Sequence, residues 1–166
     1  MKVKLSTIVE LHNNPNMVID VGGYLGDYSA KLYKQFGCKI VIFEPLFEYA
    51  EICRNRFLSN TDIKVIQKAL VGTNQDKDVI IYKAKDGSSM FEGLAESKDV
   101  ETVSYALLSE FMTNEVDLVK LNCEGAEYDI LDDLIKTGWL PKIKELLIQF
   151  HPMKSHRNIS RFVKLE

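Results

Sequence analysis

The chain has 166 residues, of which 46% are hydrophobic and 27% are charged, and its formal net charge is −3 at pH 7. This length predicts one domain with an ordinary hydrophobic core. No block of Lys and Arg is longer than two residues, and no apolar run approaches the ~20 residues that cross a bilayer, which argues against nucleic acid and membranes as partners. We therefore expect a cytoplasmic protein whose partners are small molecules or other proteins.

Cysteine and histidine usage gives no sign of a disulfide framework or a metal site. The cysteines, Cys38, Cys53 and Cys123, are odd in number and lie in apolar stretches, so we expect buried, reduced thiols. Cys123 alone lies in a candidate site, where a structural role is favoured over a nucleophilic one. The three histidines show no metal-ligand spacing, and we expect no metal.

The first patterned stretch is VIDVGGYLGDYS, Val18–Ser29. It follows a short amphipathic helix predicted over residues 4–12. A strand over Met17–Val21 ends at a cluster of three glycines, and a helix over Asp27–Phe36 follows. Glycines let the backbone turn sharply and approach a ligand closely, and the free N–H groups of a helix start suit an anionic group. The stretch predicts a turn that binds a cofactor, although a tight turn without a ligand would also explain the glycines.

The second patterned stretch is the strand Lys39–Phe43, which ends at Glu44-Pro45. Glu44 lies 22 residues after Gly22, a spacing typical of a carboxylate that accepts hydrogen bonds from ribose hydroxyls. The alternative is that Glu44 only caps the helix predicted over Phe47–Leu58.

The middle of the chain is less regular. The pattern predicts a strand over Ile63–Ile66, a strand over Val79–Tyr82, a polar loop over Lys85–Lys98, a strand over Val100–Val103 and a helix over Tyr105–Met112. We expect the strand at Val100–Val103 to pair with that at Val79–Tyr82 as an antiparallel addition to a parallel sheet.

The third patterned stretch is VDLVKLNCEGAEYDIL, Val116–Leu131. A strand over Asp117–Leu121 precedes a helix over Ala126–Lys136, and a last strand over Glu145–Phe150 ends at His151. Strands that alternate with helices predict an α/β fold with a doubly wound, mostly parallel, Rossmann-like sheet. The carboxyl ends of the strands should then bring together Gly22, Glu44, Asn122, Glu124 and His151.

The motifs VIDVGGYLGDYS, IFEP and DLVKLNCEGAEYDIL, in this order, resemble those of the FkbM-type S-adenosylmethionine-dependent methyltransferases. The resemblance spans Met17–His151, and the family's usual third signature is K-I-D-x-E-G-A-E. Asn122 stands where the family has Asp, so a hydrogen-bonding role is retained there but a negative charge is not. The resemblance implies the class I methyltransferase fold, apparently without its last two C-terminal strands.

The same resemblance implies S-adenosylmethionine as the cofactor and a small-molecule hydroxyl acceptor, on a sugar or a secondary metabolite. Contacts to the methionine side of the cofactor are implied for Asp20, Gly22, Gly23, Tyr24 and Gly26. Contacts to its ribose and adenine are implied for Glu44, Pro45, Ala69 and Leu70, with Lys68 as a further candidate. Asn122 is expected near the donor, Glu124 or His151 as the general base, and Ser88 and Ser89 near the acceptor. The alternative for Glu124 is that it only caps the helix after it.

Two other functions compete with this interpretation. A nucleotide-dependent oxidoreductase is disfavoured because the glycines lack the first gap of G-x-G-x-x-G. A non-catalytic or truncated binding module is favoured by Asn122 and by the absence of the last two strands. An unpaired edge at the fifth strand also predicts a possible homodimer.

Overall fold

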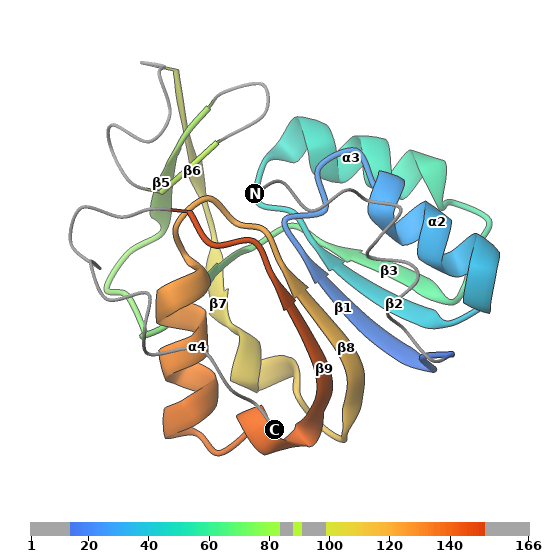
Figure 1. Cartoon of the computed structure of the whole chain (residues 1–166). Coiled ribbons are helices and arrows are strands. Elements are labelled where there is room, and N and C mark those ends of the chain that lie inside the picture. Colours follow the sequence, from blue (N-terminus) through green and yellow to red (C-terminus); the bar gives the residue numbers. More distant parts are fainter. Residues whose placement is uncertain (1–13, 84–87, 91–98, 152–166) are drawn as a thin grey trace.

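The computed structural model of the chain describes residues 14–83, 88–90 and 99–151. The helix predicted over residues 4–12 and most of the loop predicted over Lys85–Lys98 lie outside these residues. Within them, the centre of the fold is a five-stranded sheet (Figure 1). From one edge to the other its strands are β3 (Ile63–Ile66), β2 (Lys39–Phe43), β1 (Met17–Val21), β8 (Val116–Leu121) and β9 (Ile143–Ile148). Every neighbouring pair is parallel, which confirms the predicted α/β fold.

The strand order reverses at β1, which pairs with β2 on one side and with β8 on the other. The chain first builds the sheet outward from β1 to β3 and then returns to add β8 and β9 at the opposite side. In parallel sheets of this kind, ligands bind beyond the carboxyl ends of the strands where the order reverses. The fold therefore directs attention to the loops after β1, β2 and β8.

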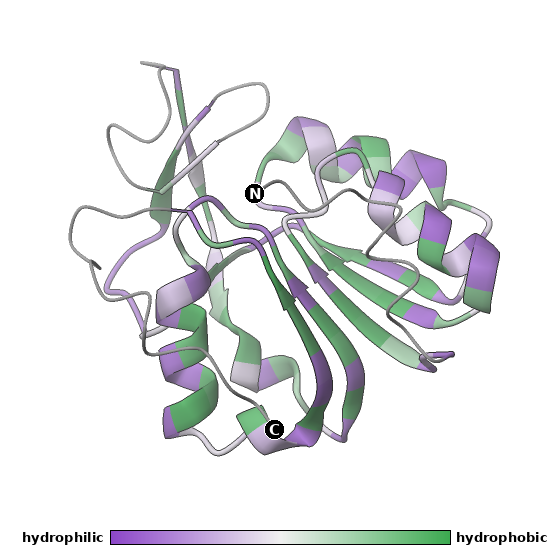
Figure 2. Cartoon of the chain, in the orientation of Figure 1, coloured by the Kyte–Doolittle hydropathy of each residue, from purple (hydrophilic) through white to green (hydrophobic). Residues whose placement is uncertain are grey.

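Each face of the sheet has its own apolar core because alternate strand residues point to opposite sides. One face carries α2 (Asp27–Phe36), with α3 (Phe47–Arg56) beside it, and the other carries α4 (Glu127–Lys136) (Figure 1). The first core contains Val18, Tyr28, Leu32, Ile40, Ile42 and Leu118. The second contains Ile19, Val21, Val119, Leu121, Ile130, Leu131 and Leu134. Figure 2 shows the result, with hydrophobic strands inside and hydrophilic residues on the outer surfaces of the helices.

Between β3 and β8 the chain forms two short pairs of strands. β4 (Ala69–Val71) runs parallel to β7 (Tyr105–Leu107), and β5 (Val79–Tyr82) runs antiparallel to β6 (Val100–Val103). The antiparallel pairing is confirmed, but the prediction that it extends the parallel sheet is wrong, because β5 and β6 form a two-stranded sheet of their own.

The helix predicted over Tyr105–Met112 is also wrong. Its first three residues are strand β7, and only η1 (Leu108–Phe111) turns, as a 3-10 helix. The backbone N–H of Ala69 donates to the carbonyl of Ser104 at 2.9 Å, and Tyr105 then pairs in register with Ala69. This long-range pairing with β4, a strand that the sequence pattern did not reveal, overrides the local helical spacing.

Among the described residues, no helix is both long and apolar enough to cross a bilayer.

Candidate functional site

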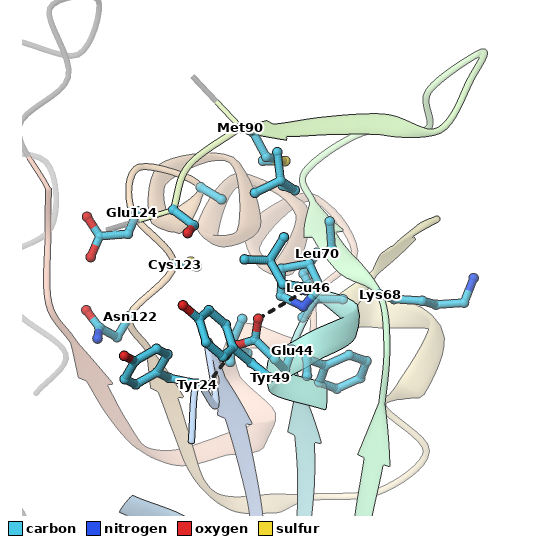
Figure 3. A pocket seen from close by; sticks show the side chains of 18 residues that line it. Tyr24, Glu44, Leu46, Tyr49, Lys68, Leu70, Met90, Asn122, Cys123 and Glu124 are labelled. Carbon is cyan, nitrogen blue, oxygen red and sulfur yellow. Dashed lines mark hydrogen bonds between the residues drawn. The ribbon is translucent and has the colours of Figure 1, made fainter. Parts of the chain in front are cut away.

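A pocket of about 180 Å³ opens beyond the carboxyl ends of β1, β2 and β8, at the reversal of strand order (Figure 3). Its position is the one that the topology favours for a ligand. Most of the residues singled out from the sequence line it, namely Gly22, Tyr24, Glu44, Pro45, Lys68, Ala69, Leu70, Ser88, Asn122 and Glu124. The structure therefore brings together segments that are far apart in the sequence, while a contact of any of them with a ligand stays a prediction.

Five of the predicted site residues, Asp20, Gly23, Gly26, Ser89 and His151, do not line the pocket. Asp20 is fully buried behind it. Gly23 packs so closely on β2 that an added Cβ would lie 2.2 Å from Cγ2 of Ile42. Gly26 is the N-cap of α2 and has a φ of 76°. The two glycines therefore shape the turn, and the structure gives neither of them a surface toward a ligand in the pocket.

Glu44 ties the glycine turn to the start of α3. Its Oε2 accepts a hydrogen bond from the backbone N–H of Tyr24 at 2.8 Å, and its Oε1 accepts one from that of Leu46 at 3.1 Å. The side chain nevertheless lines the pocket, and each carboxylate oxygen retains a second lone pair. Glu44 can therefore hold the start of α3 and bind a ligand at the same time.

Burial raises the pKa of Glu44 to about 7, although the N–H groups of Tyr24 and Leu46 act in the opposite direction. Because this pKa lies above the ordinary value of 4.5, the folded protein holds the proton more tightly than the unfolded chain. The free energy of unfolding should therefore fall as the pH rises from about 4.5 through 7. We expect a loss on the order of 2 to 3 kcal/mol from this group.

Urea unfolding at pH 5 and pH 7.5 checks this expectation. Glu44→Gln should reduce the loss between the two pH values, since glutamine does not titrate. The loss that remains includes the contribution of His151, whose pKa is raised from 6.5 to about 9. Glu48→Gln is the matched control, because Glu48 is an exposed acid on the neighbouring helix. Equal pH dependence in wild type and Glu44→Gln would contradict the assignment.

The glycine turn and Asn122 form the polar end of the pocket. Gly22 has a φ of 79°, and an added Cβ would lie 2.0 Å from the backbone oxygen of Asn122. The side-chain Oδ1 of Asn122 is buried and has no hydrogen-bond partner among the described residues. A buried acceptor without a partner is costly, and a ligand that donates a hydrogen bond would satisfy it.

The rest of the pocket is apolar and aromatic. The rings of Tyr24 and Tyr49 meet edge to face, with centroids 4.6 Å apart. Leu46, Leu70 and Met90 complete this wall (Figure 3). Such a wall beside a few polar groups suits a flat, partly polar ligand.

Three of these wall residues, Leu46, Tyr49 and Met90, were not predicted from the sequence. Leu46 and Tyr49 follow Glu44 at the start of α3, and the position of that helix after the acid is the signal that could have indicated them. Lys68, by contrast, turns its ammonium group out of the pocket and donates to the carbonyl of Tyr105 at 2.9 Å (Figure 3).

The turn between β8 and α4 is held by a fully buried carboxylate, that of Glu127. Its Oε1 accepts the backbone N–H of Cys123 at 2.8 Å, and its Oε2 accepts that of Gly125 at 2.9 Å. Within this turn Glu124 has a φ of 51°, in the left-handed region. The hydroxyl of Ser89 donates to the Glu124 carbonyl at 2.6 Å, which ties the turn to the β5–β6 side of the pocket.

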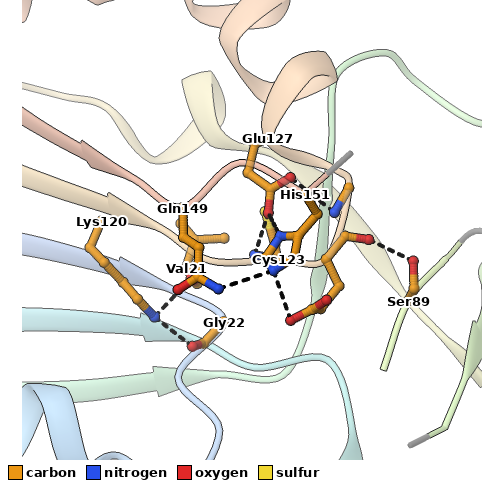
Figure 4. Close-up of polar contacts among 10 residues, drawn as sticks. Val21, Gly22, Ser89, Lys120, Cys123, Glu127, Gln149 and His151 are labelled. Carbon is orange, nitrogen blue, oxygen red and sulfur yellow. Dashed lines mark hydrogen bonds and ion pairs between the residues drawn. The ribbon is translucent and has the colours of Figure 1, made fainter. Parts of the chain in front are cut away.

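His151, which follows β9, lies between two carboxylates (Figure 4). Hydrogen bonds to Glu124 and Glu127 raise its pKa to about 9. The imidazole is therefore protonated at neutral pH and has no free lone pair with which to accept a proton. This geometry does not support the role of general base that the sequence suggested for His151.

Lys120, which the sequence reasoning missed, crosslinks β8 to the glycine turn. Its ammonium donates to Oδ1 of Asp20 at 2.8 Å. It also donates to the carbonyl of Gly22 at 2.7 Å (Figure 4). Asp20 also accepts the hydroxyl of Ser29 at 2.7 Å. Asp20 and Lys120 lie opposite each other in neighbouring buried strands, so two opposite charges at equivalent strand positions were the available signal.

Metal chemistry and thiol chemistry find no support in this part of the chain. No cluster of His, Cys, Asp and Glu in the described residues could hold a metal ion. Cys38, Cys53 and Cys123 are all free. Burial raises the pKa of the Cys123 thiol well above its ordinary value, which disfavours the reactive thiolate.

The parallel sheet, the glycine turn after β1 and the buried acid after β2 define an α/β protein of the class I methyltransferase type. Its fold is similar to the crystal structure of Methyltransferase FkbM from Methylobacillus flagellatus KT, with a TM-score of 0.51 and 14% sequence identity. The sequence matches the family described as the Methyltransferase FkbM domain over residues 20–164, and the chain belongs to that family.

The structural similarity covers 76% of this chain and 31% of the Methylobacillus chain. This chain thus spans about a third of the length of that protein. No match was found among curated proteins.

Proposed function

We propose that this chain is an S-adenosylmethionine-dependent methyltransferase that methylates a hydroxyl group of a sugar or a secondary metabolite. The observation that carries the proposal is the carboxylate of Glu44 in the wall of a pocket that also contains Gly22 and Asn122. Membership of the FkbM methyltransferase family supports the same activity.

The residues of the pocket fit this cofactor. The Glu44 carboxylate, with a free lone pair on each oxygen, would accept hydrogen bonds from the ribose hydroxyls. Leu46, Ala69 and Leu70 offer apolar surface for the adenine, and the unpaired Oδ1 of Asn122 would accept a hydrogen bond from the amino acid part. When bound, the cofactor supplies an electrophilic methyl group on a sulfonium.

The chain's own chemical task is to position an acceptor hydroxyl and remove its proton. Glu124 is the candidate for proton removal, because it is among the residues that line the pocket whereas His151 is not. A carboxylate at this wall, beside Asn122, would hold the hydroxyl by a hydrogen bond and accept its proton as the methyl group is transferred.

Isothermal titration with S-adenosylhomocysteine tests the cofactor assignment. Wild type should bind it, and Glu44→Ala should weaken binding by on the order of 1 to 3 kcal/mol because hydrogen bonds to a charged group are lost. Glu48→Ala, at an exposed acid nearby, should bind like wild type. Binding of the reduced nicotinamide cofactor alone would instead favour an oxidoreductase.

A non-catalytic binding module is the second candidate. It is favoured by Asn122, which replaces the carboxylate usual in the family's third signature. Equal affinity of Glu44→Ala and wild type for S-adenosylhomocysteine would favour this module over the enzyme.

A further inference from the structure

We propose that His151 is a positioning residue whose imidazolium fastens the β8–α4 turn, residues 122–125, to the end of β9 and so fixes one wall of the cofactor pocket. The functional part of this proposal rests on the proposed function, because the pocket wall matters only if the pocket binds the cofactor.

The geometry around the ring is that of a cation between two anions. Nδ1 of His151 lies 2.9 Å from Oε1 of Glu127, and Nε2 lies 3.1 Å from Oε1 of Glu124 (Figure 4). The ring is largely enclosed, with 15% of the side chain exposed. On the β9 side Nε2 of the ring lies 3.2 Å from the side-chain amide nitrogen of Gln149. Both of these nitrogens are donors when the ring is an imidazolium, so the amide accepts from the ring only when it is turned to present its oxygen. In the described residues, these two carboxylates are the ionisable groups that face the ring.

The turn needs such a partner because its backbone is unusual. Glu124 is a non-glycine residue with a φ of 51°, and Gly125 follows with a φ of 110°. Conformations of this kind persist only where surrounding contacts hold them. Glu127 holds the two N–H groups of Cys123 and Gly125, but it leaves the side chain of Glu124 unrestrained. His151 supplies the missing contact, and it does so from the segment that follows β9.

A neutral His151 ring would hold the β8–α4 turn less strongly than the imidazolium does. Without the second proton, one of the two ring nitrogens becomes an acceptor and faces a carboxylate oxygen, and both interactions lose their charge. Because the pKa of His151 is raised to about 9, the imidazolium persists at neutral pH and is lost as the pH rises through that value. The pocket wall should therefore loosen at alkaline pH.

The first part of the test does not depend on any ligand. We would follow the imidazole protons of the protein by NMR from pH 5 to pH 10.5 and assign His151 by its absence in His151→Gln. We expect an imidazole that titrates near pH 9 in wild type and at a lower pH in Glu124→Gln. A His151 that titrates near its ordinary 6.5 in wild type, or that is unaffected by Glu124→Gln, would overturn the proposal.

The second part measures the affinity for S-adenosylhomocysteine at pH 8 and pH 10, where Glu44 is mostly ionised. We expect His151→Gln to weaken binding at pH 8 by on the order of tenfold, the effect of losing a charged hydrogen-bond partner. The wild type should approach the variant at pH 10, while the control Glu48→Gln, at an exposed residue outside the pocket, should follow the wild type at both pH values. The ligand's own titration is common to all three proteins and cancels in the comparison.

The NMR titration and the binding measurement together distinguish failure of the proposed function from failure of the positioning role of His151. If wild type does not bind S-adenosylhomocysteine, the proposed function fails, whereas the NMR titration still reports whether His151 is held as a cation. If wild type binds and His151→Gln binds equally well at pH 8, the positioning role is overturned while the proposed function stands.

Discussion

Lys120→Met should destabilise the fold by about 3 to 5 kcal/mol, the effect expected when one member of a buried ion pair is removed. Asp20 is fully buried, and without Lys120 its carboxylate retains one side-chain partner within the described part of the chain, the hydroxyl of Ser29. The carbonyl of Gly22 loses its hydrogen bond from the ammonium at the same time. Since a domain of this size has about 5 to 15 kcal/mol of stability in total, a large fraction should be lost. Urea unfolding at pH 7 measures the change.

Two variants make this expectation specific. Lys144→Met removes the cation of an exposed pair, 2.7 Å from Asp117, and should change the stability little because solvent screens such pairs. Asp20→Asn combined with Lys120→Met should recover part of the loss, since no unpaired charge then remains in the core. A loss from Lys120→Met no larger than that from Lys144→Met would mean that the buried pair does not brace the glycine turn.

The sequence predicted the central sheet well because its inner strands, β2, β1 and β8, are apolar runs that are largely buried. β1, for example, was predicted with the bounds that the structure shows. The segment between β3 and β8 was predicted less well because its short strands are defined by their partners. Ala69–Val71 and Tyr105–Leu107 are three residues each, too short for a period to be read, and each becomes a strand through pairing with the other.

In the site, too, the positions of motif residues could be predicted from the sequence, whereas properties that depend on packing could not. The positions of Gly22, Glu44 and Asn122 in the pocket followed from strand ends alone. The protonation state of His151 did not, because it depends on the two carboxylates that the turn places beside the ring. Burial similarly decides that Asp20 braces the turn from behind and does not line the pocket.

Gly22→Ala should have the largest effect on the pocket itself. The new Cβ would lie 2.0 Å from the backbone oxygen of Asn122 and 2.9 Å from its carbonyl carbon, far inside contact distance. The φ of 79° adds a further penalty for any residue with a side chain. Either the glycine turn or the β8–α4 turn must move, and both carry pocket residues. We expect a loss of about 4 kcal/mol or more in the free energy of unfolding, together with loss of measurable S-adenosylhomocysteine binding.

Alanine substitutions at two other glycines separate the cost of the backbone conformation from the cost of the steric clash. Gly37→Ala meets nothing within 4 Å but has a φ of 62°, so it isolates the cost of backbone conformation, about 1 kcal/mol. Gly72→Ala also places a Cβ 2.0 Å from a backbone oxygen, that of Asp129, but it lies outside the pocket. It should lose stability as Gly22→Ala does, while the fraction that remains folded still binds S-adenosylhomocysteine. If folded Gly22→Ala still binds S-adenosylhomocysteine, binding does not depend on the close approach of the glycine turn to Asn122, and the site of this ligand would then lie outside the pocket.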